Sequence, residues 1–387
     1  MRHQRALLAI CGIFLIVSAC APTAPPKVTP SSASSAASLV PSTGTSPTSS
    51  AISPDAVSAV DAMLANMSSQ SLFSGSVLIS QHGHVLLSKG YGLADRAQKT
   101  PNDPQTRFAI GSNTKQFTAA AILLLEVQGK LKVTDRICAY IPQCPSAWAV
   151  ITIKELLTHT SGIPDFLNTL PDFAGYAGPP LTPLQIIAHF RDVPLEFAPG
   201  TTWKYSNSGY FLLGYIIEQV SGQSYESFLQ KSILTPLNLR DTGYNHGSNG
   251  VAVGYADGYT TTPTKPEDPS LPYAAGSLYS TVEDMNRWEH ALTTDAVLPA
   301  ASRAEMLATQ VAIPGGDPMS DGYGYGFIIG TDAGRPIIWH GGAIPGFLSI
   351  EARYPVDDVT VIILSNRMDA ALQVIFEAIS TKIINAA

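Results

Sequence analysis

Residues 111–131 read GSNTKQFTAAAILLLEVQGKL, in which a serine and a lysine stand three positions apart before an almost wholly apolar run. The apolar run has the length and composition of a buried helix. If the helix begins at Ser112, then Ser112 and Lys115 share one face, with Cβ atoms about 5–6 Å apart. A serine hydroxyl needs a base to take its proton, and burial lowers the pKa of a lysine toward that task. The stretch therefore predicts a nucleophile beside its base, the alternative being a surface lysine without a role.

The bulk composition suits one large folded domain. The chain has 387 residues, of which 45% are hydrophobic, and a formal net charge of −7. This is ample for a large core, in a single domain or in two interleaved lobes. No basic run stands out, so we expect no nucleic-acid partner.

The N-terminal residues predict export and a membrane tether. MRHQR followed by ALLAICGIFLIVSA is typical of a signal peptide, here residues 1–19, and is too short to span about 30 Å of hydrocarbon comfortably. Small residues precede Cys20, as in a bacterial lipobox, so we expect Cys20 to be lipidated; a signal peptide with a chance cysteine is the alternative. Residues 20–54, rich in Ser, Thr, Ala and Pro, should form a disordered linker. The domain would then face the periplasm from a membrane, the outer one being favoured where two exist.

Two cysteines remain outside these segments, Cys138 and Cys144 in ICAYIPQCP. An exported chain meets an oxidising compartment, so the pair predicts a disulfide, with free thiols or a metal site as alternatives. His82 and His84 flank a predicted turn, and we interpret them as exposed turn residues rather than as a metal pair. We expect neither a metal nor a cofactor.

The order of predicted elements indicates an α/β fold of the α+β type. Helix patterns cover residues 55–70 and the last apolar segment, a hairpin covers 74–92, and several short strands follow residue 320. Helices dominate the middle of the chain. We expect domain 55–387 to hold one antiparallel sheet built from both ends of the chain and covered by the first and last helices. The sheet lobe would take about 55–111 and 320–387, and an inserted helical lobe about 112–319.

A second motif is Tyr205-Ser206-Asn207, which follows the turn signal Pro199-Gly200 and precedes an apolar helix. A tyrosine beside a lysine can shuttle a proton, and the Asn207 amide can bind both the lysine and a substrate carbonyl. The alternative is a helix cap with Tyr205 as a packing residue.

A third motif is His340-Gly341-Gly342, at the end of a β-rich run. Glycines let a substrate backbone approach a strand closely. The Ala343 N–H, together with the Ser112 N–H, can then stabilise a developing oxyanion. The alternative is a tight turn between two strands.

The order Ser-x-x-Lys, Tyr-x-Asn, His-x-Gly resembles the serine β-lactamase and penicillin-binding protein superfamily, which includes class C β-lactamases, D-alanyl-D-alanine carboxypeptidases and related esterases. LLTHTSGIPDF (156–166) and PGTTWKYSNSGY (199–210) are also similar to segments of this family. The resemblance covers about 55–387 and implies the β-lactamase-like fold. It also implies roles for individual residues: Ser112 as the acylated nucleophile, Lys115 as its base, Tyr205 as proton relay, Asn207 and His340 as substrate-orienting groups, and the backbone at Gly342 and Ala343 as an oxyanion hole with Ser112.

One position departs from many members of the family, which carry a lysine where this chain has His340. Histidine is mostly neutral at pH 7 unless a carboxylate raises its pKa, so a substrate carboxylate should bind weakly here. We therefore expect a monomeric serine hydrolase that acts on a D-alanyl-type amide or a small ester, as a small molecule or derived from peptidoglycan. The alternatives are a β-lactamase and a non-catalytic penicillin-recognising envelope protein. We interpret His159 as structural.

Overall fold

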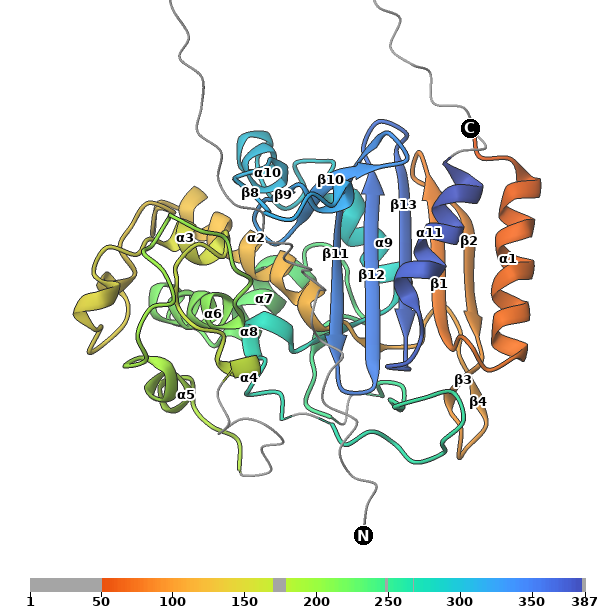
Figure 1. Cartoon of the computed structure of the whole chain (residues 1–387), viewed down its shortest axis with the longest axis horizontal. Coiled ribbons are helices and arrows are strands. Elements are labelled where there is room, and N and C mark those ends of the chain that lie inside the picture. Colours follow the sequence, from red (N-terminus) through yellow and green to blue (C-terminus); the bar gives the residue numbers. More distant parts are fainter. Residues whose placement is uncertain (1–50, 170–178, 248–249, 267, 385–387) are drawn as a thin grey trace, which may run out of the picture. The chain divides into compact units, whose positions relative to one another are not determined.

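Figure 1 shows the computed structural model of the protein, which describes residues 51–169, 179–247, 250–266 and 268–384. The predicted signal peptide, the predicted lipid site Cys20 and most of the predicted linker lie outside the described residues. Within these ranges, no helix has the length and apolar character needed to cross a membrane.

The described residues form an eight-stranded antiparallel sheet in the order β2-β1-β13-β12-β11-β10-β9-β8. Strand β1 pairs with β13 from Gly75↔Ser365 to Gln81↔Val359, so strands from the two ends of the domain lie side by side in the sheet. This confirms the expected sheet. The strands are β1 (Gly75–Gln81), β2 (His84–Tyr91), β8 (Val311–Ala312), β9 (Gly322–Tyr323), β10 (Ile328–Asp332), β11 (Arg335–Ile344), β12 (Phe347–Tyr354) and β13 (Val359–Ser365).

Every residue of β1 and β13 is buried, because helices cover both faces of the sheet. Successive side chains of a strand point to opposite faces of the sheet, so they pack into two separate hydrophobic cores. Val77 and Ile79 belong to the core with α1 (Pro54–Ser69) and α11 (Leu372–Ile383), which Figure 1 shows against the sheet. Leu78 belongs to the other core, which contains residues of α2 and α9.

The rest of the chain is mainly helical, and α2 packs against α6 and α8 in its middle (Figure 1). Helix α9, however, packs on β1 and β13, so the expected helical lobe 112–319 contributes one helix to the sheet. The face of β1 and β13 that α1 and α11 leave open also carries apolar side chains, such as Leu78, and these require a cover from some part of the chain. The helices are α2 (Thr114–Val127), α3 (Ile153–Leu157), α4 (Phe166–Thr169), α5 (Pro183–Phe190), α6 (Asn207–Ser221), α7 (Tyr225–Leu229), the π-helix η5 (Gln230–Leu234), α8 (Tyr273–Gly276), α9 (Val282–Ala291), α10 (Ala300–Leu307) and the 3-10 turns η1 (Gly111–Asn113), η2 (Ile137–Ala139), η3 (Ser146–Trp148) and η6 (Pro318–Ser320).

Two small sheets complete the fold. One pairs β3 with β4, and the other has the order β5-β7-β6. Their strands are β3 (Leu93–Asp95), β4 (Thr100–Pro101), β5 (Phe108–Ala109), β6 (Gly243–Tyr244) and β7 (Leu278–Ser280). Strand β5 matters most for function, because the chain runs directly from it into the Ser112 turn.

The folded domain begins before Pro54, where the linker was expected to end. Ile52 is buried, and its backbone N–H donates to the Gln81 Oε1 atom at 2.8 Å. The Ser53 hydroxyl accepts from the Ala56 N–H at 3.1 Å and so caps α1, with Pro54 at its first position. Ser and Pro are linker-like by composition, but in this position they start a helix.

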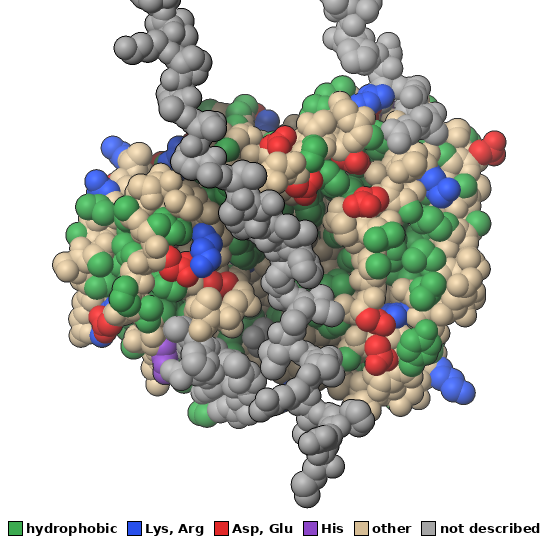
Figure 2. Space-filling view, viewed as in Figure 1, with side chains coloured by type: hydrophobic (Ala, Val, Ile, Leu, Met, Phe, Trp, Pro, Cys, Tyr) green, Lys and Arg blue, Asp and Glu red, His purple; other side chains and the backbone are tan. Residues whose placement is uncertain are grey.

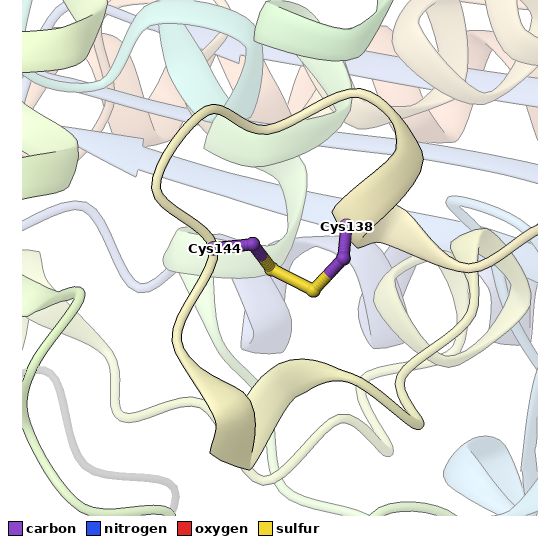
Figure 3. The surroundings of a disulfide bond; sticks show 2 residues. All are labelled: Cys138 and Cys144. Carbon is purple, nitrogen blue, oxygen red and sulfur yellow. A yellow bond between two sulfur atoms is a disulfide. The ribbon is translucent and has the colours of Figure 1, made fainter.

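Cys138 and Cys144 form a disulfide bond in the structure, with Cα atoms 5.3 Å apart (Figure 3). The bond closes a loop with a sequence separation of 6 between η2 and η3. The chain-entropy model gives such a short loop about 2 kcal/mol of stabilisation.

The surface is chemically mixed on the face shown in Figure 2. Basic side chains there stand apart from one another among acidic, apolar and other polar groups. His82 lies at the turn between β1 and β2 and is exposed, as expected for a turn residue. Its Nδ1 atom lies 3.3 Å from the Asp358 Oδ2 atom.

Candidate active site

Ser112 emerges from a segment that is otherwise inside the protein. The chain passes from β5 through the turn η1 into α2, and between residues 108 and 123 Ser112 alone is not buried. Gly111 has a φ of +52°, a conformation that favours glycine and lets the chain turn sharply just before Ser112. The strand-to-turn-to-helix geometry thus presents one hydroxyl from the core.

Lys115 lies wholly inside the protein, with 0% exposure. Its Nζ atom lies 3.0 Å from Ser112 Oγ, 2.8 Å from Asn207 Oδ1 and 2.8 Å from the Ala275 carbonyl oxygen. Burial lowers the pKa of Lys115 from 10.5 to about 7, against a smaller opposing effect of the Asp165 carboxylate. The neutral form of the Lys115 amine is therefore accessible near neutral pH.

The hydrogen-bond partners of Lys115 also orient it. A neutral amine has two N–H donors and one lone pair, and a carbonyl oxygen can only accept. The oxygens of Ala275 and Asn207 take the two donors, which leaves the lone pair for the Ser112 hydroxyl proton. The arrangement is that of a base aimed at a nucleophile.

Tyr205 lies just before α6, whose first residue is Asn207. The Lys115 Nζ atom lies 4.8 Å from the centroid of the Tyr205 ring, and Ser112 is close enough to lower the pKa of Tyr205 against the larger effect of burial. Burial raises the pKa of Tyr205 well above its usual 10, so the phenol keeps its proton at neutral pH. Tyr205 is thus placed to donate a proton, while Lys115 is placed to accept one.

His340 lies inside β11, not in the tight turn that was the alternative for its motif; the turn between β11 and β12 comes later, at residues 345 and 346. The His340 Nδ1 atom lies 2.6 Å from the Gly341 carbonyl oxygen, which can only accept, so Nδ1 carries the hydrogen. Its Nε2 atom then accepts from the Tyr323 hydroxyl at 3.2 Å. Burial, with Lys115 nearby, lowers the pKa of His340 to about 3, so the ring is neutral.

Two glycines let β11 lie against the turn that carries Ser112. A Cβ atom on Gly342 would lie 2.0 Å from the Ile110 carbonyl oxygen, and one on Gly111 would lie 2.8 Å from the Ala343 backbone nitrogen. Side chains at these positions would push the strand and the turn apart. The backbone at Ala343 consequently lies beside the residue that precedes Ser112.

The comparison with known families agrees with this geometry. The Beta-lactamase family model matches residues 59–380. The chain belongs to the Beta-lactamase family.

Relatives in this family include a penicillin-binding protein. Penicillin-binding protein 4* of Bacillus subtilis (strain 168) is 31% identical over an alignment of 314 residues, and the match covers 76% of this chain and 68% of the relative. Among solved structures, the octameric penicillin-binding protein homologue from Pyrococcus abyssi has a TM-score of 0.75 and 28% identity, over 85% of this chain and 77% of the homologue. The D-stereospecific amidohydrolase from Streptomyces sp. has a TM-score of 0.71 and 26% identity, over 85% and 99%. The expected β-lactamase-like fold is therefore confirmed.

In this member of the Beta-lactamase family, His159 packs against Tyr205 and holds the chain just before α6 in place. Its φ is +59°, and its Nδ1 atom accepts from the Ser206 N–H at 3.2 Å. The ring is buried among four aromatic side chains, Trp203, Tyr205, Tyr210 and Tyr323. Burial, with the nearby Lys115, lowers the pKa of His159 well below 6.5, so the ring stays neutral. These contacts fit the structural role expected for His159, since they hold the loop before α6 next to the 159–165 loop.

Sequence reasoning missed two residues of the site, Tyr323 and Asp165. Tyr323 fixes the ring of His340, and the Asp165 carboxylate accepts from the Asn207 amide at 3.0 Å. Tyr323 stood in the segment YGYGF, and Asp165 in HTSGIPDF, each among several candidates. No spacing rule separated them from their neighbours, because their partners are 17 and 42 positions away in sequence.

Proposed function

We propose that this protein is a serine hydrolase that works through an acyl-enzyme on Ser112 and accepts a D-alanyl-type amide or a small ester. One observation carries the proposal: the buried Lys115, whose pKa burial lowers to about 7, lies 3.0 Å from Ser112, whose hydroxyl is the only partly exposed one in residues 108–123. A lysine in this state can serve as a general base at physiological pH.

The acylation step follows from the contacts. Lys115 takes the Ser112 proton while Oγ forms a bond to the substrate carbonyl carbon, and the carbonyl π electrons move to the oxygen. The backbone N–H groups of Ser112 and Ala343 stabilise that oxyanion. When the oxyanion collapses, the bond to the leaving group breaks, and Tyr205 donates its proton to the leaving nitrogen or oxygen. Lys115 returns its proton to Tyr205, and Ser112 is left as an ester.

Deacylation reverses these roles with water. A water molecule attacks the Ser112 ester and gives its proton to the Lys115–Tyr205 pair, and the Ser112 oxygen leaves and regains the proton. The same two groups therefore serve both halves of the reaction, which needs no further acid or base.

The charge state of His340 supports a choice among substrates. A neutral His340 supplies no fixed positive charge for a substrate carboxylate. This favours an amide or ester whose leaving group is uncharged over a β-lactam, which carries a carboxylate. The similarity to the D-stereospecific amidohydrolase from Streptomyces sp. supports the amide side of the proposal.

The test compares four acyl donors with purified protein: a D-alanine amide, a D-alanyl-D-alanine peptide, a p-nitrophenyl ester and nitrocefin. The variants are Ser112→Ala and a matched control, Ser69→Ala, whose exposed hydroxyl lies at the end of α1. We expect amide or ester turnover in the wild type and the control and none in Ser112→Ala. Intact-mass analysis after exposure to a fluorescent penicillin, with mapping of any labelled residue, tests whether Ser112 is the residue that becomes acylated.

The alternatives have distinct outcomes in the same experiment. Nitrocefin turnover faster than ester and amide turnover would identify a β-lactamase. Equal behaviour of wild type and Ser112→Ala on all four donors would identify a non-catalytic protein and end the proposal.

We also propose that a lipid on Cys20 anchors the protein to the cell envelope. The small residues before Cys20 and the Ser/Thr/Pro-rich segment after it support this. In detergent phase partition of protein expressed in its own host, the wild type should enter the detergent phase, and Cys20→Ser should enter the aqueous phase. If the variant stays in the detergent phase, a segment other than Cys20 anchors the protein to the membrane.

A further inference from the structure

A buried carboxylate lies directly behind the Lys115–Asn207 hydrogen bond. Asp165, between α3 and α4, is 6% exposed. Its oxygens accept from the Asn207 Nδ2 atom at 3.0 and 3.3 Å, from the Asn168 Nδ2 atom at 2.6 Å and from the Leu167 N–H at 3.2 Å. These N–H donors can satisfy an ionised carboxylate. Among the described residues, no basic side chain is in direct contact with Asp165.

The carboxylate decides which way the Asn207 amide points. An ionised carboxylate only accepts hydrogen bonds, so it selects the NH₂ end of the amide. The oxygen end then faces Lys115, whose Nζ lies 2.8 Å from it. With the amide reversed, an NH₂ group would face the amine, and an oxygen would face the carboxylate.

We propose that Asp165 is a positioning residue, which holds the Asn207 oxygen toward Lys115 and thereby leaves the amine's lone pair for Ser112. The catalytic consequence rests on the proposed function, because it takes Lys115 as the base. The orientation itself rests on the contacts of Asn207, which are independent of any substrate.

Asp165 also acts on Lys115 through charge. Its carboxylate raises the pKa of Lys115 against the larger effect of burial, and the approach of Lys115 in turn lowers the pKa of Asp165, which burial raises. In the described residues, the other titratable groups around Lys115 are Tyr205 before α6 and Tyr210 on α6, whose rings it contacts, and two histidines. These are His340 on β11 and His159, and burial lowers the pKa of both. Both tyrosines keep their protons and His340 is neutral, so Asp165 supplies the negative charge at this site.

The test measures the pKa of Lys115 directly, by NMR titration of protein labelled with ¹³Cε-lysine, with the signal assigned through Lys115→Arg. Asp165→Asn removes the charge at nearly constant shape and should lower the pKa of Lys115 by about one unit. The matched control is Asn168→Ala, which removes another hydrogen bond to the same carboxylate but keeps the charge. In this control the pKa of Lys115 should not fall.

The pH dependence of kcat/KM gives a second readout, which would not change if Asp165 had only a structural role. In Asp165→Asn, the acidic limb of the kcat/KM profile should move to lower pH by the same amount, and the plateau rate should fall about tenfold or more as the amide loses its orientation. Should Asp165→Asn fail to fold, Asp165→Ser neutralises the same position with a smaller side chain.

The two proposals fail in different ways. If Ser112 is acylated but the pKa of Lys115 is unchanged or higher in the neutral variants, Asp165 has no positioning role. If the pKa falls as expected but Ser112 is never acylated, the effect of the Asp165 charge on Lys115 holds and the proposed function is wrong.

Discussion

Replacing Lys115 with methionine measures how strongly burial disfavours its charge. Methionine has a similar length and no charge, so the variant lacks this titration in both the folded and the unfolded state. In the wild type, the pKa of Lys115 is about 7 when folded and close to 10.5 when unfolded. Between these values the unfolded chain binds one more proton than the folded protein, so wild-type stability rises with pH relative to the variant.

The size of the effect follows from the same two values. One pKa unit corresponds to about 1.4 kcal/mol, so the difference in unfolding free energy should change by about 1.4 kcal/mol per pH unit between pH 7 and pH 10.5. The total change is about 5 kcal/mol, and the curve should be flat below pH 7. Lost hydrogen bonds to Ser112, Asn207 and Ala275 shift the whole curve by a constant and leave its slope unaffected.

The assay is urea denaturation of wild type and Lys115→Met from pH 6 to pH 10, with the disulfide intact. Lys130→Met, at an exposed position just after α2, is the matched control for replacing a lysine with methionine. A difference between wild type and Lys115→Met that varies by less than 1 kcal/mol from pH 7 to pH 10 would mean that Lys115 stays charged in the folded protein. The proposed base would then be lost.

Three further predictions concern other parts of the site and its support. Burial raises the pKa of Glu351 well above its usual value, so the wild-type protein loses stability as the pH rises and this group is forced to ionise. In thermal unfolding, Glu351→Gln should therefore be more stable than wild type at pH 8, and this difference in stability should fade toward pH 4. Gly342→Ala places a Cβ atom 2.0 Å from the Ile110 carbonyl oxygen and should cost about 1–3 kcal/mol in denaturant unfolding; an unchanged midpoint would contradict the close approach of β11. Tyr205→Phe should lower the ester kcat by about 10²–10⁴-fold, whereas Tyr259→Phe, at a side chain that is 79% exposed, should match wild type in the same assay.

Local patterns predicted most of the elements correctly. The β1–β2 hairpin, the helix after Ser112 and the last helix each follow from apolar spacing and turn residues in one short segment. The pattern was ambiguous at the third motif, for which a tight turn was the alternative. His340-Gly341-Gly342 has the composition of a turn but lies within β11, because the glycines let Ile110 approach and β12 supplies the hydrogen bonds.

The helix α9 shows a different limit. Ser280 and Thr281 both precede its acidic first turn and could cap the helix. Thr281 is the cap, since its side chain accepts from the Asp284 N–H at 3.1 Å. The pattern alone did not reveal that this helix covers β1 and β13, because an apolar stripe is compatible with any apolar partner surface.

The sequence by itself determined which residues could perform the chemistry: Ser112, Lys115, Tyr205, Asn207 and His340 all stand in motifs whose order is visible in the chain. Only the tertiary structure decided their states. The Lys115 amine is bound by Asn207, 92 positions away, and by Ala275, 160 positions away, and its pKa depends on the core that excludes water around it. The same holds for the neutral ring of His340 and for Asp165, since charge and hydrogen-bond direction depend on burial and on neighbours that folding brings together.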